Sequence, residues 1–303
     1  MRHHYIPEFL LKVWTESTLD NKVEVFRLDL AGVPSNRYSP RHTGYEKDLY
    51  ALSRDQVAGL DAQHVETKIL KPVDNDAAVV LKKLLLGRLN DLTKAENVNW
   101  VIFLMSLRVR RPEFVNFLKS DEPKKLIGSA IKNPKKHGFS SENPDPHAVR
   151  EFIEKKEPGL TDNLAMVHFG DFITDRDDAM EIGRMTWSLH HFRNQKHHLL
   201  LSDDPLIFTE KSIDHPDLII MLPVSPDKVF IATKTIFATR WIRQHRAKDV
   251  VRYINEWSVF QAKKRIFACD RSQHRFILNR INKRHTQARK QKDLNNQKQQ
   301  LIT

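Results

Sequence analysis

The sequence of 303 residues has little of several residue types that mark common protein classes. Its single cysteine, Cys269, cannot form an internal disulfide and cannot complete a paired-cysteine zinc site. With nine glycines in the whole chain, a glycine-rich phosphate loop is not expected, and neither that motif nor a nucleophile elbow is present. Because the sequence also lacks a long apolar run and a signal peptide, we expect a soluble, cytoplasmic protein with no membrane partner.

Positive charge is the property that the sequence has in excess. The formal net charge is +12, and the segment from Arg271 to the end holds nine Lys or Arg residues against the single acid Asp293. The segment therefore carries +8, and the remaining body carries only +4. A basic tail of this kind predicts salt-sensitive affinity for nucleic acid or another polyanion.

The pattern of apolar residues predicts an α+β protein, with a mostly helical N-terminal half and an antiparallel sheet in the C-terminal half closed by a packing helix. Helical spacing covers residues 61–90 (interrupted by Pro72), 95–107, a stretch from 112, 152–166, 172–180 and 249–267. Residues 121–145 are predicted to be a surface loop with a short helical piece. Strands are predicted at 22–30, 185–192, 197–202, 207–209, 218–223 and 229–233. We expect one α+β domain over residues 1–270 and a basic, partly helical or disordered tail over residues 271–303.

Two adjacent histidines stand directly before a predicted helix start at Pro7. Proline suits the first helical position, and Glu8 complements the positive end of the helix dipole. The same field disfavours imidazolium, so His3 or His4 would be neutral and able to bind a metal or accept a proton. The alternative is that one ring caps a backbone group and the other faces water.

Two carboxylates follow a predicted strand in the sequence Leu201-Ser202-Asp203-Asp204-Pro205. Carboxylates at a strand end can hold a divalent cation if a third ligand arrives from elsewhere. Turn formation alone explains Asp and Ser at this position about as well.

Three further groups have ordinary structural explanations beside functional ones. His190, His191, His197 and His198 would face one another across a hairpin formed by residues 185–202, where two could chelate zinc or all could be exposed strand residues. Glu66 and Asp74 lie about two helical turns apart, as solvated charges or as aligned carboxylates. Arg108, Arg110 and Arg111 end a helix, where they complement its dipole or contact phosphate.

Several of these segments occur together in one known family. The sequences His3-His4-Tyr5-Ile6-Pro7-Glu8-Phe9-Leu10-Leu11, Ser202-Asp203-Asp204-Pro205, Pro223-Val224-Ser225-Pro226 and the helix with Asn255 and Gln261-Ala262 resemble, in the same order, the domain-of-unknown-function family four-two-three-eight. Its members open with His-His-Tyr-x-Pro and later carry a Ser-Asp-x-Pro turn. The similarity runs from about His3 to Cys269 and excludes the basic tail.

The resemblance implies that His3, His4, Asp203 and Asn255 belong to one shared arrangement. With Glu66 and Arg111 these positions are the candidate catalytic residues, and His4 and Asp203 are the candidate metal ligands. The four histidines and the Lys-rich tail are departures from the family pattern.

Two functions remain open from the sequence. The first is a metal-dependent phosphodiester hydrolase of the nuclease kind, in which His3 or His4 acts as base or ligand, Asp203 holds Mg²⁺, Mn²⁺ or Zn²⁺, and Arg111 neutralises the phosphate. The second is a non-enzymatic module that binds nucleic acid or another polyanion, in which the same histidine and aspartate residues are structural.

Overall fold

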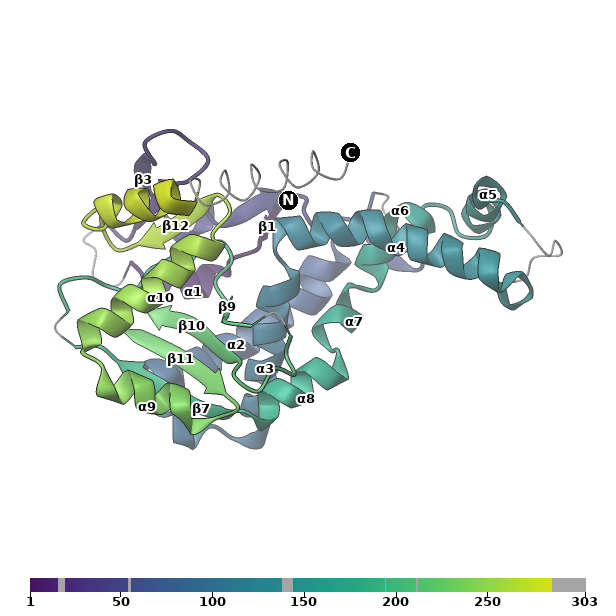
Figure 1. Cartoon of the computed structure of the whole chain (residues 1–303). Coiled ribbons are helices and arrows are strands. Elements are labelled where there is room, and N and C mark those ends of the chain that lie inside the picture. The colour runs from purple at the N-terminus through teal and green to yellow at the C-terminus, as the bar shows by residue number, and fades with distance from the viewer. Residues whose placement is uncertain (16–19, 54–55, 138–143, 194, 211, 285–303) are drawn as a thin grey trace, which may run out of the picture. The chain divides into compact units, whose positions relative to one another are not determined.

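The computed structural model describes residues 1–15, 20–53, 56–137, 144–193, 195–210 and 212–284 (Figure 1). The chain forms two compact units, which are described separately below. Unit 1 comprises residues 1–5, 45–80 and 92–183, and unit 2 comprises residues 6–44, 81–91 and 184–303. The predicted single domain over residues 1–270 stays a prediction, and residues 285–303 of the predicted tail lie outside the described residues.

Unit 1 is mostly helical. Its two short ribbons pair β1 (Arg2–His4) with β4 (Tyr45–Lys47) and β5 (Gln56–Val57) with β6 (Leu60–Asp61), both antiparallel. A π-helical segment, η2 (Val65–Leu70), leads into α2 (Lys71–Leu85), whose last turns belong to unit 2. The other helical segments are α3 (Lys94–Val109), α4 (Pro112–Lys132), η4 (Pro134–His137), α5 (Pro146–Lys156), α6 (Leu160–Val167), α7 (Phe169–Ile173) and α8 (Arg176–Arg184).

Helix α3 begins where its local sequence requires it to begin. The Thr93 hydroxyl accepts a hydrogen bond from the Glu96 N–H, and the Glu96 carboxylate accepts one from the Thr93 N–H, which forms a complete capping box. Trp100, Phe103 and Leu104 lie on the buried face of the helix. The predicted helix over residues 95–107 is confirmed.

Helix α4 differs from the prediction, because it continues through the predicted loop to Lys132 and contains Pro123. The helix packs along α5 and α6 and buries Val115, Leu118 and Ala130. Tertiary packing of this kind overrides the local cost of an internal proline. The prediction of a loop over residues 121–145 is wrong for its first half.

Unit 2 contains two antiparallel four-stranded sheets, which confirms the α+β class. The first has the order β3-β2-β12-β8 and the second has the order β7-β11-β10-β9. The strands are β2 (Val23–Arg27), β3 (Ser35–Tyr38), β7 (Thr186–His191), β8 (Leu201–Ser202), β9 (Ile207–Phe208), β10 (Ile219–Ser225), β11 (Lys228–Thr233) and β12 (Arg265–Ala268). The helical segments are α1 (Glu8–Val13), η1 (Pro40–His42), η3 (Leu89–Asp91), α9 (Ile236–Gln244), α10 (Ala247–Gln261) and residues 274–284.

The predicted hairpin over residues 185–202 is not formed. Strand β7 pairs with β11, whereas β8 pairs with β12 in the other sheet. His190 and His191 therefore lie opposite Val229 and Lys228. The predicted helix over residues 249–267 is too long at its C-terminal end. Helix α10 stops at Gln261, and residues 265–268 form β12, which pairs with β2.

Helix α10 packs against both sheets of unit 2 (Figure 1). Val250 and Ile254 join the core over β10 and β11, while Val259 joins the core that contains Phe26 and Ile266. Burial at these positions orients the opposite side of α10 toward solvent. Among the described residues, no helix combines the length and apolarity that crossing a bilayer would require.

Candidate functional site

His3 is fully buried in unit 1 and uses both ring nitrogens inside the protein. Its Nδ1 accepts the backbone N–H of Tyr50 at 2.8 Å, so the proton is on Nε2, which donates to Gln63 Oε1 at 2.6 Å. The His3 and Tyr50 rings are stacked with their centroids 5.4 Å apart. Burial lowers the pKa of His3, which keeps the imidazole neutral. His3 is thus neutral, as predicted, and the physical cause in the structure is burial of the ring.

A buried polar cluster continues from Tyr50. The Tyr50 hydroxyl donates to the Arg110 carbonyl at 2.6 Å, and burial raises the pKa of Tyr50. The Arg110 side chain is 0% exposed and forms a two-pronged ion pair with Asp74, with N···O distances of 2.9 and 3.2 Å. The guanidinium also donates to the carbonyl and hydroxyl of Ser106. The Asp74 carboxylate therefore forms an ion pair inside unit 1, so the interpretation of Asp74 as a solvated surface charge is wrong.

Glu66 stands on the π-helical turn next to this cluster. Its Oε2 is buried without a hydrogen-bond partner. Burial raises the pKa of Glu66 to about 7, opposed by the positive charge of Arg110 and reinforced by the negative charge of Asp74. A carboxyl group with a pKa near neutrality can both take up and release a proton at physiological pH. π-Helical turns occur frequently at functional sites.

His4 and Arg111 also belong to unit 1. The His4 ring is half-buried and lies 5.5 Å from the Tyr45 ring. Arg111 precedes α4 as its N-cap residue, and its Nε donates to the Arg108 carbonyl at 2.9 Å. The role predicted for each, metal ligand or base for His4 and phosphate partner for Arg111, stays a prediction.

Asp203 belongs to unit 2 and closes the junction between β8 and β12. Its carboxylate accepts the backbone N–H groups of Lys263, Lys264 and Arg265 at 2.8, 2.6 and 2.9 Å. The residue is 7% exposed. These bonds satisfy three backbone donors between the end of α10 and the start of β12, and they stabilise this junction.

Asn255 holds the chain that leads into β8. Its Oδ1 accepts the N–H of Leu200 at 2.8 Å, and its Nδ2 donates to the His198 carbonyl at 2.9 Å and to Gln273 Oε1 at 3.0 Å. The amide is thus fully used by neighbours within unit 2. Within the part of the chain that the structure describes, no three His, Cys, Asp or Glu residues gather as possible metal ligands.

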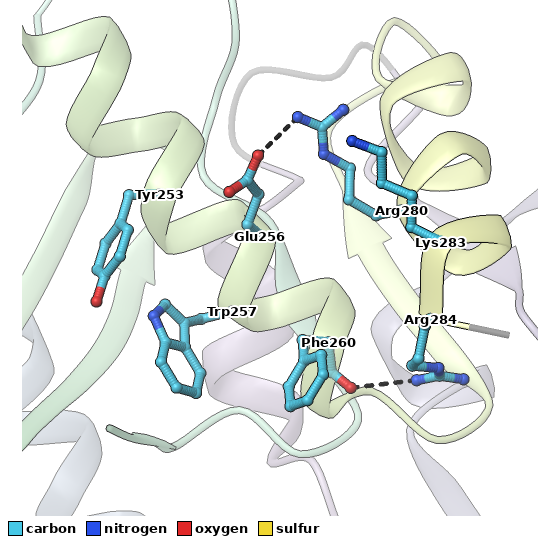
Figure 2. A pocket seen from close by; sticks show the side chains of 7 residues that line it. All are labelled: Tyr253, Glu256, Trp257, Phe260, Arg280, Lys283 and Arg284. Atoms are coloured by element: carbon cyan, nitrogen blue, oxygen red, sulfur yellow. Dashed lines mark hydrogen bonds and ion pairs between the residues drawn. The ribbon is translucent and has the colours of Figure 1, made fainter. Parts of the chain in front are cut away.

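A different feature of unit 2 has the composition of a binding site. A hollow of about 380 Å³ lies between α10 and the helical residues 274–284. Aromatic side chains of α10 form one wall and basic side chains the other (Figure 2). The hollow is lined by Tyr253, Glu256, Trp257, Phe260, Arg280, Lys283 and Arg284. We call it the α10 groove.

The aromatic wall of the α10 groove is a row of three rings along the helix, of which Tyr253 and Trp257 are half-buried against the core over β10 and β11. The Tyr253 and Trp257 centroids are 6.4 Å apart, and those of Trp257 and Phe260 are 6.1 Å apart, both edge to face. Phe260 is 59% exposed. Trp241 of α9 extends the row, with its centroid 5.0 Å from that of Tyr253.

The basic wall is fixed by contacts with α10. Arg280 pairs with Glu256 at 2.7 Å, and its guanidinium lies over the Phe276 ring at 3.9 Å. Arg284 Nη1 donates to the carbonyls of Phe260 and Ala262 at 3.2 and 2.7 Å, which satisfies the last turn of α10. Burial lowers the pKa of Arg284, with the charge of Asp203 opposing. The pair Arg280–Glu256 is neutral, so Lys283 and Arg284 give the groove its positive charge.

Comparison with known proteins places most of this chain in one family. The family model described as "Protein of unknown function (DUF4238)" matches residues 2–272. The chain belongs to this family. The DUF4238 match includes all six candidate site residues and α10, whereas Arg280, Lys283 and Arg284 lie beyond it. Neither a curated protein nor a solved structure matches the chain.

Sequence reasoning did not find the α10 groove within this DUF4238 protein. Tyr253, Trp257 and Phe260 follow the helical spacing of core residues, and the sequence alone assigns all three to the buried face. The prediction holds in part, because Tyr253 and Trp257 are half-buried against the core, whereas Phe260 is exposed. Arg280, Lys283 and Arg284 belong to the segment that the sequence predicts to be a basic tail.

Proposed function

We propose that this protein binds single-stranded nucleic acid along the α10 groove. The observation that supports the proposal is that Tyr253, Trp257 and Phe260 of α10 line the same hollow as Lys283 and Arg284 of the neighbouring helical segment (Figure 2). Aromatic rings stack with unpaired bases, and each stacked base contributes about 1 to 3 kcal/mol. Cationic side chains beside such rings contact the phosphates that link the bases.

The groove chemistry favours an unpaired strand over a duplex. Bases in a duplex are stacked on each other, so their faces are not available to Trp257 or Phe260. A duplex would be held only through phosphates, and the groove offers Lys283 and Arg284 for that purpose. Binding through a few phosphates alone is weak and falls steeply with salt concentration.

The six residues predicted from the sequence offer less support for binding or catalysis than the groove does. The polar side-chain atoms of His3, Asp203 and Asn255 make hydrogen bonds within their own units. In this proposal they hold β1, β8 and β12 in place. This corresponds to the binding-module function that the sequence left open.

The experiment compares two groove variants with two matched controls in the full chain. Binding of a fluorescein-labelled thymidine 20-mer is followed by anisotropy at low and moderate salt. We expect Phe260→Ala and Lys283→Gln to weaken binding, the first by about 5-fold or more. Phe117→Ala removes a comparably exposed ring of α4, and Lys248→Gln removes an exposed charge of α10 outside the groove, so both should bind as the unaltered chain does. Equal effects of the groove and control variants would refute the proposal.

A phosphodiester hydrolase is the second candidate, and Glu66 is the observation that favours it. Its pKa of about 7 and its Oε2 without a hydrogen-bond partner suit a group that removes a proton from water as the water oxygen attacks phosphorus and the ester P–O bond breaks. Within unit 1, His4 and Arg111 keep the roles given to them above, metal ligand or base and phosphate partner. Cleavage of DNA or RNA by the full chain with Mg²⁺, Mn²⁺ or Zn²⁺, lost in Glu66→Gln and kept in the exposed Glu151→Gln, would support it. No cleavage with any of the three metals would remove this candidate.

A further inference from the structure

A second hollow in unit 2 is built from chemistry that the α10 groove does not use. It measures about 690 Å³ and lies between the last turns of α2 and the turn that joins β10 to β11. Val13, Leu85, Leu86 and Pro226 supply apolar surface, and Lys82, Lys228 and Asp227 supply charge. The volume lies in the range of small-molecule sites, which combine apolar walls with a few placed polar groups.

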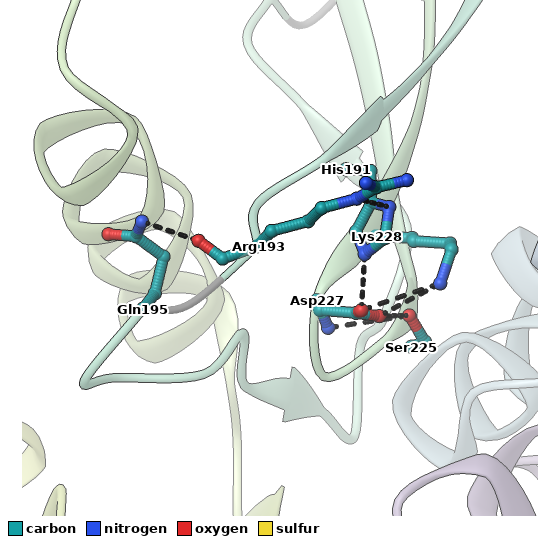
Figure 3. Close-up of polar contacts among 6 residues, drawn as sticks. All are labelled: His191, Arg193, Gln195, Ser225, Asp227 and Lys228. Atoms are coloured by element: carbon teal, nitrogen blue, oxygen red, sulfur yellow. Dashed lines mark hydrogen bonds and ion pairs between the residues drawn. The ribbon is translucent and has the colours of Figure 1, made fainter.

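The Asp227 carboxylate makes polar contacts with three neighbouring side chains, which Figure 3 shows. Its carboxylate oxygens contact His191 Nε2 at 2.6 Å and the Ser225 hydroxyl at 2.6 Å, and they lie 3.2 and 3.4 Å from Lys228 Nζ. Hydrogen bonds from Ser225, Lys228 and His191 hold the pKa of Asp227 below its usual value against the opposing effect of burial. Asp227 is therefore a fixed negative charge that sets the position of Lys228.

The remaining charge in the hollow is positive. Lys228 has three N–H donors, and its contacts with Asp227 are long for a charged pair, so donor capacity remains. Lys82 is exposed at the rim. Two ammonium groups against one carboxylate leave a net charge of +1 beside an apolar wall, of which Leu86 is 68% exposed.

We propose that this hollow binds a small monocarboxylate with an apolar chain. The carboxylate would accept hydrogen bonds from Lys82 and Lys228, and the chain would cover Leu85, Leu86 and Pro226. A neutral molecule would lose the charged hydrogen bonds with Lys82 and Lys228, and a short acid would lose the apolar contacts with Leu85, Leu86 and Pro226. His198 also lines the hollow.

Isothermal titration calorimetry of the full chain with octanoate, octan-1-ol and acetate tests this proposal. Octanoate should bind at one site per chain and about 10-fold more tightly than either of the others. Lys82→Gln should weaken octanoate binding several-fold, whereas Lys71→Gln, at an exposed position of the same helix, should not. Leu86→Ser should weaken octanoate and octanol alike.

Four results would overturn the assignment. Three of them are octanol affinity equal to octanoate affinity, equal effects of the Lys82 and Lys71 substitutions, and no saturable octanoate binding at millimolar concentration. Phe260→Ala, which alters the α10 groove, should leave octanoate affinity unchanged. A loss of octanoate affinity in that variant would place the ligand in the α10 groove and would also contradict the proposal.

Discussion

The backbone N–H of Tyr50 donates to His3 Nδ1 at 2.8 Å while the two rings stack nearly parallel, 5° apart. Residues 47 positions apart in the sequence are thereby joined by a buried hydrogen bond and by ring contact. The second nitrogen of His3 is held by Gln63, so the imidazole has one tautomer and one orientation. His3 connects β1 with the chain that follows β4 within unit 1.

Replacing His3 should destabilise the fold in a pH-dependent way. We expect His3→Ala to lower the free energy of unfolding by about 2 to 4 kcal/mol at pH 8, because the Tyr50 N–H and the Gln63 carbonyl lose their partner in a buried place. Burial lowers the pKa of His3 in the folded chain below the ordinary histidine value of about 6.5, so the unfolded chain binds more protons as pH falls through that region. The contribution of His3 is therefore complete above about pH 6.5 and declines at lower pH.

Urea unfolding at pH 8 and pH 5 measures this difference. His147→Ala is the matched control, since His147 is exposed at the start of α5. A loss in His3→Ala no larger than in the control would mean that His3 has no structural role.

The ion pair of Arg110 with Asp74 should be required for folding of unit 1. Asp74→Ala leaves a guanidinium that is 0% exposed without its carboxylate, which should cost about 3 to 5 kcal/mol. Asp76→Ala removes an exposed carboxylate from the same helix two residues away and should cost less than about 0.5 kcal/mol. Thermal and urea unfolding of the two variants distinguish them, and similar stabilities would show that the pair contributes little.

Glu66 should make the protein less stable as pH rises. Its pKa is raised from 4.5 to about 7, so the folded chain binds more protons than the unfolded chain between these values. Stability from this group therefore declines from about pH 4.5 to pH 7. Glu66→Gln should be more stable than the unaltered chain by about 1 to 3 kcal/mol at pH 8, and the difference should narrow toward pH 5. A difference that does not change with pH would contradict the raised pKa.

Replacement of Asp203 distinguishes a structural role of this residue from a role as a metal ligand. Asp203→Ala leaves three backbone N–H groups without their acceptor and should lower the free energy of unfolding by about 2 to 4 kcal/mol. Asp217→Ala, at an exposed position of the same unit, should have little effect. A metal ligand would behave differently, because its replacement would abolish metal affinity, measured by calorimetry with Mn²⁺ or Zn²⁺, and leave the stability of the metal-free protein unchanged.

The elements that could be predicted from the sequence are those whose pattern is complete within a short segment. Pro7 and Glu8 predict the start of α1, and the Trp100 stripe predicts α3. The hairpin over residues 185–202 could not be excluded locally, because the strand partner of β7 is β11, some forty residues later. Ile266 and Phe267 fit the spacing of α10 equally well as a helix or as the strand β12.

The sites show the same division. The sequence indicates His3 and Asp203, but no sequence motif displays their partners, which are backbone N–H groups for Asp203 and the Tyr50 N–H and Gln63 side chain for His3. Arg110 and Asp74 are separately ordinary, and only the fold joins them in one buried cluster. The α10 groove combines Tyr253 and Trp257, which are half-buried against the core, with the exposed Phe260, and the helical spacing alone does not distinguish these positions.

The central claim is tested most directly by the anisotropy of a labelled single strand titrated with the full chain and with Phe260→Ala, alongside a duplex of the same length. The account predicts that the single strand binds more tightly than the duplex and that Phe260→Ala removes most of this preference while leaving duplex affinity unchanged. Equal affinity for both forms, or a preference that survives in Phe260→Ala, would contradict it.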